Sequence, residues 1–173
     1  MSTTATKPAK TITGARALVD GLVREGIDHV FGIPGTQNLA ILDELRVTPQ
    51  IRFILTRHEQ GAAFMSYGFA RASGKPSVVT VTEGPGVTNI VTAIAAAYKG
   101  NVPVISITGV QESIMRERDA TQDMDQIPFM RPITKWAYSI PYVDKVQEAV
   151  RKAFRVALTE PQGPTHIEAA SEV

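Results

Sequence analysis

Residues 77–89, Ser-Val-Val-Thr-Val-Thr-Glu-Gly-Pro-Gly-Val-Thr-Asn, change from one structural pattern to another. The first part, Ser77–Val81, is dominated by β-branched residues, which is typical of a strand buried on both faces of a sheet. Two glycines, Gly84 and Gly86, follow, and the alanine-rich stretch Ile90–Tyr98 comes next. The segment therefore predicts a buried strand, a glycine loop at its carboxyl end and a closely packed helix.

The same alternation of strands and helices extends in both directions from this segment. Further strands are expected at His29–Gly32, at Arg52–Thr56, at Val104–Thr108, near Tyr138 and at Thr165–Ala169. Further helices are expected at Ala15–Val23, Leu39–Leu45, His58–Arg71 and Val143–Leu158. This alternation predicts an α/β fold, a doubly wound, mostly parallel six-stranded sheet with helices on both faces. The longest irregular segment, Gly109–Pro128, follows a strand and so lies at the edge of the sheet where ligands bind.

The bulk composition is that of an ordinary globular domain. The chain has 173 residues, 43% of them hydrophobic, which suits one domain with a sizeable core. The formal net charge of +1 does not favour nucleic acid or an anionic membrane surface, and no apolar run approaches transmembrane length. With no cysteine, disulfides and zinc–thiolate sites are excluded. Residues 1–10 lack the apolar stretch of a secretory signal, so we expect a flexible tail, then one domain over residues 11–173, in a cytoplasmic protein.

Three loops follow predicted strands and are therefore expected at the same edge of the sheet. They are Gly32-Ile-Pro-Gly35, Arg57-His-Glu-Gln-Gly61 and Thr82-Glu-Gly-Pro-Gly-Val-Thr-Asn89. The first can also be a plain strand-to-helix turn, and Glu59 in the second can be an acid favoured by the helix dipole. Glu59 is followed by small residues, however, and these let a backbone or a flat ligand approach closely.

The third loop has a partial likeness to a dinucleotide-binding fingerprint. Gly84 and Gly86 precede a helix, but Asn89 stands where a third glycine is expected. The acidic residue expected about twenty positions further on is also missing. Dinucleotide binding is therefore the weaker interpretation of this loop.

Taken together, the three loops and their neighbours resemble the thiamin-diphosphate enzyme superfamily at its pyrimidine-binding domain, in the acetolactate-synthase-like branch. The resemblance is carried, in order, by Val30–Gly35, Thr56–Pro76, Thr82–Asn89, Val102–Gly109 and Arg131–Tyr138. It extends from about Thr11 to the end of the chain. Five segments in the family's order and spacing make the resemblance specific.

The resemblance implies a catalytic role for Glu59. In this family the matching glutamate hydrogen-bonds N1′ of the cofactor's aminopyrimidine. A proton shared at N1′ favours the imino form at the 4′ position, and that nitrogen can then accept the C2 proton of the thiazolium ring. The expected cofactor is thiamin diphosphate, and the expected substrates are 2-keto acids.

The resemblance also assigns the residues around the cofactor and the substrate. The pyrimidine pocket is expected to be formed by Pro34, Gly35, Glu59, Thr82, Gly84, Pro85 and Asn89. Gln122 matches a glutamine that faces the substrate side, and His58, beside Glu59, is expected on the same side. His166, in the last predicted strand, has no ligand-like partner nearby in the sequence, and we expect it to be structural.

Two residues depart from the family pattern. Thr121 stands where synthases commonly carry an aromatic residue, and Glu83 stands where a small serine is usual. Both departures weigh against acetolactate synthesis itself as the reaction. Decarboxylases, lyases, oxidases and carboligases share this domain, so the fold does not choose among them.

The resemblance further implies a partner domain or subunit. In the family a separate domain with a Gly-Asp-Gly run binds the diphosphate and its Mg²⁺, and no such run occurs in this chain. The chain is thus expected to be inactive in isolation and to pair with copies of itself as a dimer or tetramer. The alternative is a non-catalytic α/β module that binds a nucleotide or a protein partner, and Glu59 favours the catalytic interpretation.

Overall fold

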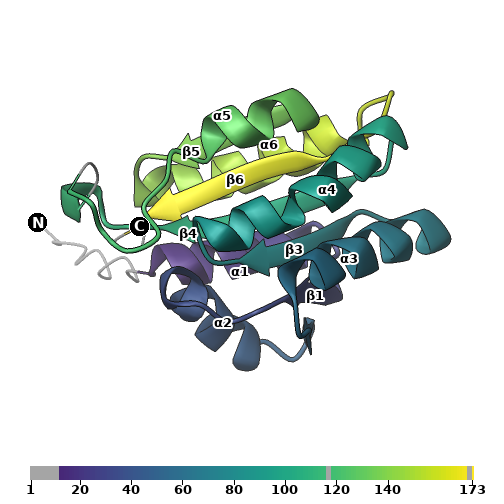
Figure 1. The fold of residues 1–173 in the computed structure, drawn as a ribbon. Helices are drawn as coiled ribbons and strands as arrows, with labels where there is room; N and C mark the ends of the chain where they lie inside the picture. The colour runs from purple at the N-terminus through teal and green to yellow at the C-terminus, as the bar shows by residue number, and fades with distance from the viewer. Residues whose placement is uncertain (1–11, 116–117, 171–172) are drawn as a thin grey trace, which may run out of the picture.

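The central sheet of the computed structural model has six strands, all of them parallel, in the order β2-β1-β3-β4-β6-β5 (Figure 1). The strands are β1 (His29–Gly32), β2 (Arg52–Leu55), β3 (Ser77–Val81), β4 (Val104–Val110), β5 (Trp136–Ile140) and β6 (Thr165–Ala170). The structure describes residues 12–115, 118–170 and 173, so the tail expected at residues 1–10 lies outside it. The predicted fold class is confirmed, and the sheet is wholly rather than mostly parallel.

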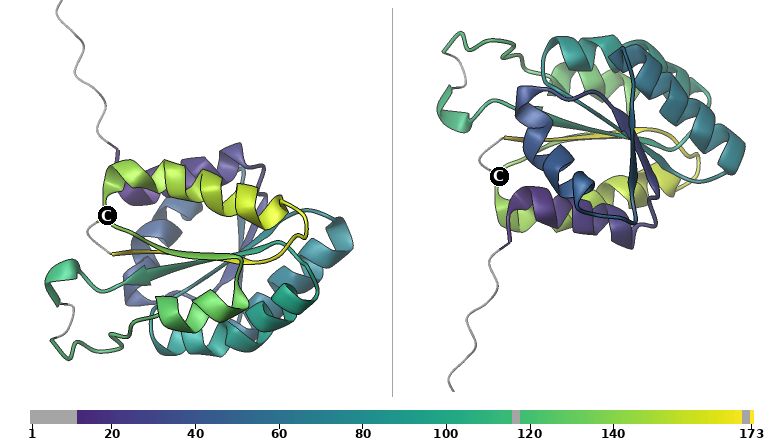
Figure 2. Two further views of the ribbon diagram at one scale, coloured as in Figure 1. Left: turned by 90° about the horizontal axis from the view of Figure 1, so that it is seen from above. Right: turned by 90° about the horizontal axis from the view of Figure 1, so that it is seen from below.

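Helices cover both faces of the sheet, as the views in Figure 2 show. They are α1 (Gly14–Arg24), α2 (Leu39–Arg46), α3 (Glu59–Ser73), α4 (Pro85–Lys99), α5 (Ile127–Met130) and α6 (Val146–Leu158). One apolar core lies beneath α1, α2 and α6, and a second lies beneath α3, α4 and α5. Strands β3 and β4 are buried along their whole length between these cores, as their β-branched sequences predict.

Several element boundaries differ from the prediction, and two of these differences lie next to the site loops. Helix α4 begins at Pro85 rather than at Ile90, because proline at the first position of a helix fits the required backbone and needs no hydrogen-bond donor. The segment predicted as irregular, Gly109–Pro128, begins inside β4 and ends inside α5. Both differences lie at the carboxyl edge of the sheet and shorten the loops there.

The strand order changes direction at the centre of the sheet. From β1 the chain moves outward to β2 and then returns to the other side of β1 to form β3. Such a switch point separates the loops that follow the two neighbouring strands and leaves a crevice at their carboxyl ends. The loops after β1 and β3 are those at Gly32–Gly35 and Thr82–Asn89. The topology therefore brings two of the three predicted site loops to the crevice.

A cluster of polar side chains interrupts the apolar core beneath the carboxyl edge. Glu83, Gln126 and Glu168 are all buried, with exposed fractions of 0%, 1% and 4%. Glu83 Oε2 accepts a hydrogen bond from the backbone N–H of Gln111 at 2.6 Å. Gln126 Nε2 donates to Glu168 Oε2 at 2.9 Å, and its Oε1 accepts from the N–H of Gly84 at 3.1 Å. The cluster thus connects the ends of β3, β4 and β6.

The two buried carboxyls of this cluster titrate in opposite directions. Burial raises the pKa of Glu83; the Gln111 N–H opposes the rise, and the carboxylates of Asp123 and Glu168 add to it. Burial alone would also raise the pKa of Glu168, but its interactions with His166, Gln126 and Ser139 together outweigh burial and hold that pKa below its usual value. Of the two carboxyls, Glu83 therefore keeps its proton to higher pH and Glu168 loses its proton at lower pH.

We expect Glu83→Gln to change how stability depends on pH. Glu83 binds its proton more tightly in the folded chain than in the unfolded chain. Protonated Glu83 therefore stabilises the fold at low pH. This stabilisation is lost as pH rises from the ordinary glutamate pKa through the raised pKa. As pH rises above the ordinary glutamate pKa, the variant should gain stability relative to the parent, by about 1.4 kcal/mol per unit of pKa shift removed. Urea unfolding at several pH values measures this difference.

Glu168→Gln is the matched control for this measurement. The lowered pKa of Glu168 means that its charge stabilises the fold above the ordinary glutamate range, and that this contribution is lost as pH falls through the lowered pKa. The control should therefore lose stability relative to the parent as pH rises. A profile for Glu83→Gln that runs parallel to the parent profile would contradict a raised pKa at Glu83.

Candidate functional site

The loops after β1 and β3 are in direct contact at the switch point. A Cβ added to Gly35 would lie 2.4 Å from Cβ of Thr82, so only glycine allows the two backbones to approach this closely. Thr82 Oγ1 donates a short hydrogen bond to Oε1 of Gln37, which follows the first loop. Gly35 and Thr82, both predicted site residues, are therefore brought together.

The first loop is held in shape by a buried asparagine. Asn38 is 0% exposed; its Oδ1 accepts from the N–H of Gly35 at 2.8 Å and its Nδ2 donates to the carbonyl of Ile33 at 3.1 Å. These bonds close the turn around Pro34, which is itself exposed. The loop thus presents Pro34 to the outside while its ends are fixed to the sheet.

Glu59 and Asn89 form a hydrogen bond between the first turns of two helices. Glu59 is the first residue of α3, and Asn89 lies one turn into α4, which packs against α3. Asn89 Nδ2 donates to Glu59 Oε2 at 2.9 Å, and both side chains are half-buried. Within the described part of the chain Asn89 is the only hydrogen-bond partner of this carboxylate. One carboxylate oxygen is thus held while the other remains available to a ligand.

His58 has a local structural role in this chain. Its Nδ1 accepts from the N–H of Gln60 at 3.1 Å, so the ring caps the N-terminus of α3 and fixes the start of the helix that carries Glu59. The side chain is exposed. Its expected place on the substrate side stays a prediction.

Gly84 lies beneath the segment that carries Gln122. Its φ of 63° is in the left-handed region, and a Cβ added there would lie 2.5 Å from the carbonyl oxygen of Gln122. Gln122 also has a positive φ, 71°, and its side chain is exposed. Pro85, the next residue, is exposed at the start of α4. The predicted substrate-side residue therefore stands directly over the predicted cofactor loop.

The arrangement suits an aminopyrimidine ring. A carboxylate with one oxygen engaged by an amide can share a proton with a ring nitrogen through the other oxygen. Beside it, a Cβ added to Gly61 would meet nothing within 4 Å, so the first turn of α3 leaves open space for a flat group. The residues present thus fit the pyrimidine half of thiamin diphosphate. Among the described residues, no group of three or more His, Asp or Glu side chains is placed to hold a metal ion.

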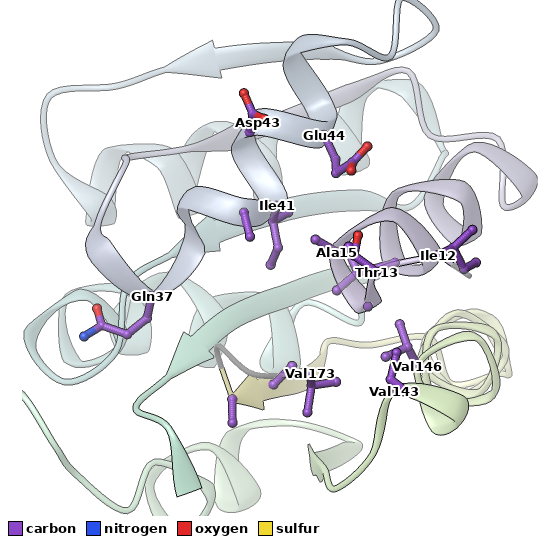
Figure 3. Close-up of a pocket in the computed structure, with 15 residues that line it drawn as sticks. Ile12, Thr13, Ala15, Gln37, Ile41, Asp43, Glu44, Val143, Val146 and Val173 are labelled. Carbon is purple, nitrogen blue, oxygen red and sulfur yellow. The ribbon is translucent and has the colours of Figure 1, made fainter. Parts of the chain in front are cut away.

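A cavity of about 550 Å³ lies next to these loops but does not contain Glu59 or Asn89 (Figure 3). It is lined mainly by apolar side chains from the start of α1, from α2, from the start of α6 and from the end of β6. Ile41 and Val146 point into it in Figure 3, and Asp43 and Glu44 lie on α2 at its border. Gln37, the partner of Thr82, belongs to its wall. Gln37 therefore separates this cavity from the crevice at the switch point.

Several residues of the site could not be found from local sequence patterns. Gln37 and Gln126 contact the loop after β3 only because the folded chain brings them to it, and Glu168 in turn holds Gln126. Asn38 closes the loop after β1 from a few residues further on. The structural role expected for His166 agrees with its environment, because the side chain is 0% exposed and has polar neighbours. Its Nδ1 lies 2.9 Å from Ser106 Oγ on β4, and its Nε2 lies 3.7 Å from Glu168 Oε2. Residues at alternate positions on a strand share a face, so the spacing of His166 and Glu168 was the available signal.

No helix in the described ranges is long and apolar enough to span a membrane.

Comparison with known proteins agrees with this geometry. The chain is 42% identical over 168 residues to the acetolactate synthase isozyme 1 large subunit of Escherichia coli K12. The aligned residues make up 97% of this chain and 30% of that protein. It is 41% identical to an acetolactate synthase of Arthrospira platensis, over 95% of this chain and 29% of that one. A probable acetolactate synthase large subunit of Methanocaldococcus jannaschii is 42% identical, over 92% of this chain and 27% of that one. The chain thus spans less than a third of the length of these relatives.

The family model points to the same domain. The model described as "Thiamine pyrophosphate enzyme, N-terminal TPP binding domain" matches residues 12–129. The matched range contains β1 to β4, the three site loops, Gln122 and the start of α5. The chain belongs to the thiamine pyrophosphate enzyme family and is its N-terminal, pyrimidine-binding domain.

Proposed function

We propose that this domain supplies the pyrimidine side of a thiamin-diphosphate site in a longer enzyme that acts on 2-keto acids. The observation that carries the proposal is the 2.9 Å hydrogen bond between Asn89 Nδ2 and Glu59 Oε2, which leaves the second carboxylate oxygen available. Similarity to acetolactate synthases over most of the chain supports a carboligase or decarboxylase reaction. Glu83 and Thr121, the two departures from the synthase pattern, leave open which of these reactions it is.

Each predicted residue then has a defined task. Glu59 holds a proton at N1′ of the pyrimidine, and Asn89 orients its carboxylate. Gly35 lets its loop approach Thr82, and Gly84 lets its loop lie against Gln122. Pro34, Thr82 and Pro85 shape the pocket. Gln122, over Gly84, faces the keto acid. When bound, thiamin diphosphate supplies the carbon nucleophile that no amino-acid side chain offers.

The diphosphate and Mg²⁺ are assigned to a second domain or subunit. Mg²⁺ prefers oxygen ligands together with phosphates. Of the two acidic side chains in the site loops, Glu59 is engaged by Asn89 and Glu83 is fully buried. The relatives are more than three times as long as the aligned segment, which leaves room for such a domain. We infer that the isolated domain has no catalytic activity.

The exposed face of α3 supports pairing between two copies of the domain. Gly61, Phe64, Met65 and Gly68 are exposed and recur at helical spacing along one stripe. Phe64 and Met65 are 41% and 46% exposed, and a Cβ added to either glycine would meet nothing within 4 Å. An apolar stripe with small residues lets another helix approach closely. We therefore place a two-fold interface on α3, with the neighbouring α4 beside it.

The alternative is a non-catalytic α/β module that binds a nucleotide or a protein partner. In such a module Glu59 would serve only as an acid at the N-terminus of a helix. Its bond to Asn89, on a different helix, is an additional constraint that a dipole role does not require. The catalytic proposal accounts for both residues.

Replacing Glu59 by Gln in the complete enzyme tests the proposed function. The amide has the same shape and still accepts a bond from Asn89, so the fold should be kept while the exchangeable carboxyl proton is lost. Exchange of the cofactor's C2 proton with deuterated water should slow by about a hundredfold or more. The control is Glu148→Gln, an exposed residue on α6 across the sheet, which should leave the exchange rate unchanged. Exchange at the parent rate in Glu59→Gln would show that Glu59 has no catalytic role and serves only as an acid at the N-terminus of α3.

Replacing Met65 by Glu tests the proposed interface. A charge in the centre of a buried apolar contact is costly, so the dissociation constant of the homodimer should rise by about tenfold or more. Sedimentation equilibrium over a range of protein concentrations measures this constant. Leu39→Glu is the control, because Leu39 is 53% exposed but lies on α2, away from the stripe. Equal effects of the two variants, or a parent chain that is monomeric at all concentrations, would show that the stripe is not an interface.

A further inference from the structure

The segment between β4 and α5 is attached at both of its ends to two consecutive residues after β3. At its start, the backbone N–H of Gln111 donates to Glu83 Oε2 at 2.6 Å. At its end, Gln126 Oε1 accepts from the N–H of Gly84 at 3.1 Å. Glu83 and Gln126 are 0% and 1% exposed, so neither contact competes directly with bulk water.

A further contact carries this attachment to the middle of the segment. The side chain of Gln111 turns back across the segment, and its Nε2 donates to the carbonyl of Thr121 at 3.0 Å. The next residue is Gln122, whose carbonyl lies against Gly84 so closely that a Cβ there would be only 2.5 Å away. The path from Glu83 through Gln111 and Thr121 therefore ends on the residue that faces the substrate side.

We propose that Glu83 is a positioning residue. Through Gln111, and together with Gln126, Glu83 holds the segment that carries Gln122 against Gly84. It thereby sets the distance between the substrate side and the cofactor side of the site. The effect on substrate rests on the proposed function; the attachment itself does not.

The chemistry of Glu83 suits this task. Its Oε1 is buried and has no hydrogen-bond partner within the described residues, while its Oε2 takes the Gln111 N–H. The charged groups that face it are the carboxylates of Asp123 and Glu168, and both favour a neutral Glu83. A glutamate side chain offers an acceptor oxygen to the Gln111 N–H whether it is charged or neutral. A serine, which is usual here in the family, has a side chain too short to take the same place.

Amide hydrogen exchange of the 173-residue chain tests the attachment. In Glu83→Leu the acceptor is removed, and in Gln111→Ala the bond to Thr121 is removed, so exchange of residues 118–126 should quicken by about tenfold in each. Glu83→Gln keeps an acceptor oxygen and should restore most of the protection. Glu112→Leu, an exposed neighbour, is the control and should exchange like the parent. Because Gln111 is only half-buried, Gln111→Ala decides the matter if Glu83→Leu does not fold.

Steady-state kinetics of the complete enzyme test the effect on substrate. Glu83→Leu should raise KM for the 2-keto acid by about tenfold and leave C2 proton exchange of the cofactor near the parent rate, and Glu83→Gln should restore KM. Unchanged protection of residues 118–126 in Gln111→Ala, or in a folded Glu83→Leu, overturns the attachment, whatever the activity. If Glu83→Leu lowers the exchange protection of residues 118–126 but leaves KM unchanged, Glu83 does not position the substrate. Absence of C2 exchange in the parent enzyme refutes the proposed function instead, and the hydrogen-exchange result still decides the attachment.

Discussion

The contact between Gly35 and Thr82 is the constraint on which the site depends. Parallel strands end at a common edge, but a change in strand order normally separates the loops on its two sides. Here the absence of a side chain at Gly35 lets the loop after β1 reach the loop after β3, and Gln37 and Asn38 fix it there. Once these loops are joined, the start of α4 is fixed relative to β1. Asn89 is then held one turn into α4, within hydrogen-bond distance of Glu59.

Apolar and polar contacts stabilise different parts of the domain. The two apolar cores hold the helices on the sheet, and they leave the loops at its carboxyl edge free to vary. The loops are fixed instead by a small number of hydrogen bonds between buried polar groups, and such bonds specify geometry because an unmet partner is costly. Glu83, Gln126 and Glu168 supply this second kind of contact beneath the edge of the sheet.

The strands were predictable because their signal is local. Ser77–Val81 and Val104–Thr108 are apolar and β-branched over their whole length, and both are buried in the centre of the sheet. The start of α4 was predicted too late, because the alanine pattern begins at Ile90 whereas Pro85 determines where the helix begins. Glu59 and Asn89 could be chosen by resemblance, but their contact depends on how α3 packs against α4. Gln37 and Gln126 carry no local signal at all, since each acts on a loop far away in the sequence.

The buried carboxyl at position 83 has a consequence for the exchange of loops between relatives. A segment such as residues 111–126 cannot be transplanted alone into a domain that has serine at position 83, because the N–H of Gln111 would arrive without its acceptor. Residues 83, 111, 126 and 168 form one connected group at the ends of β3, β4 and β6, although they lie far apart in the sequence. Loop and anchor must therefore change together when such a domain diverges.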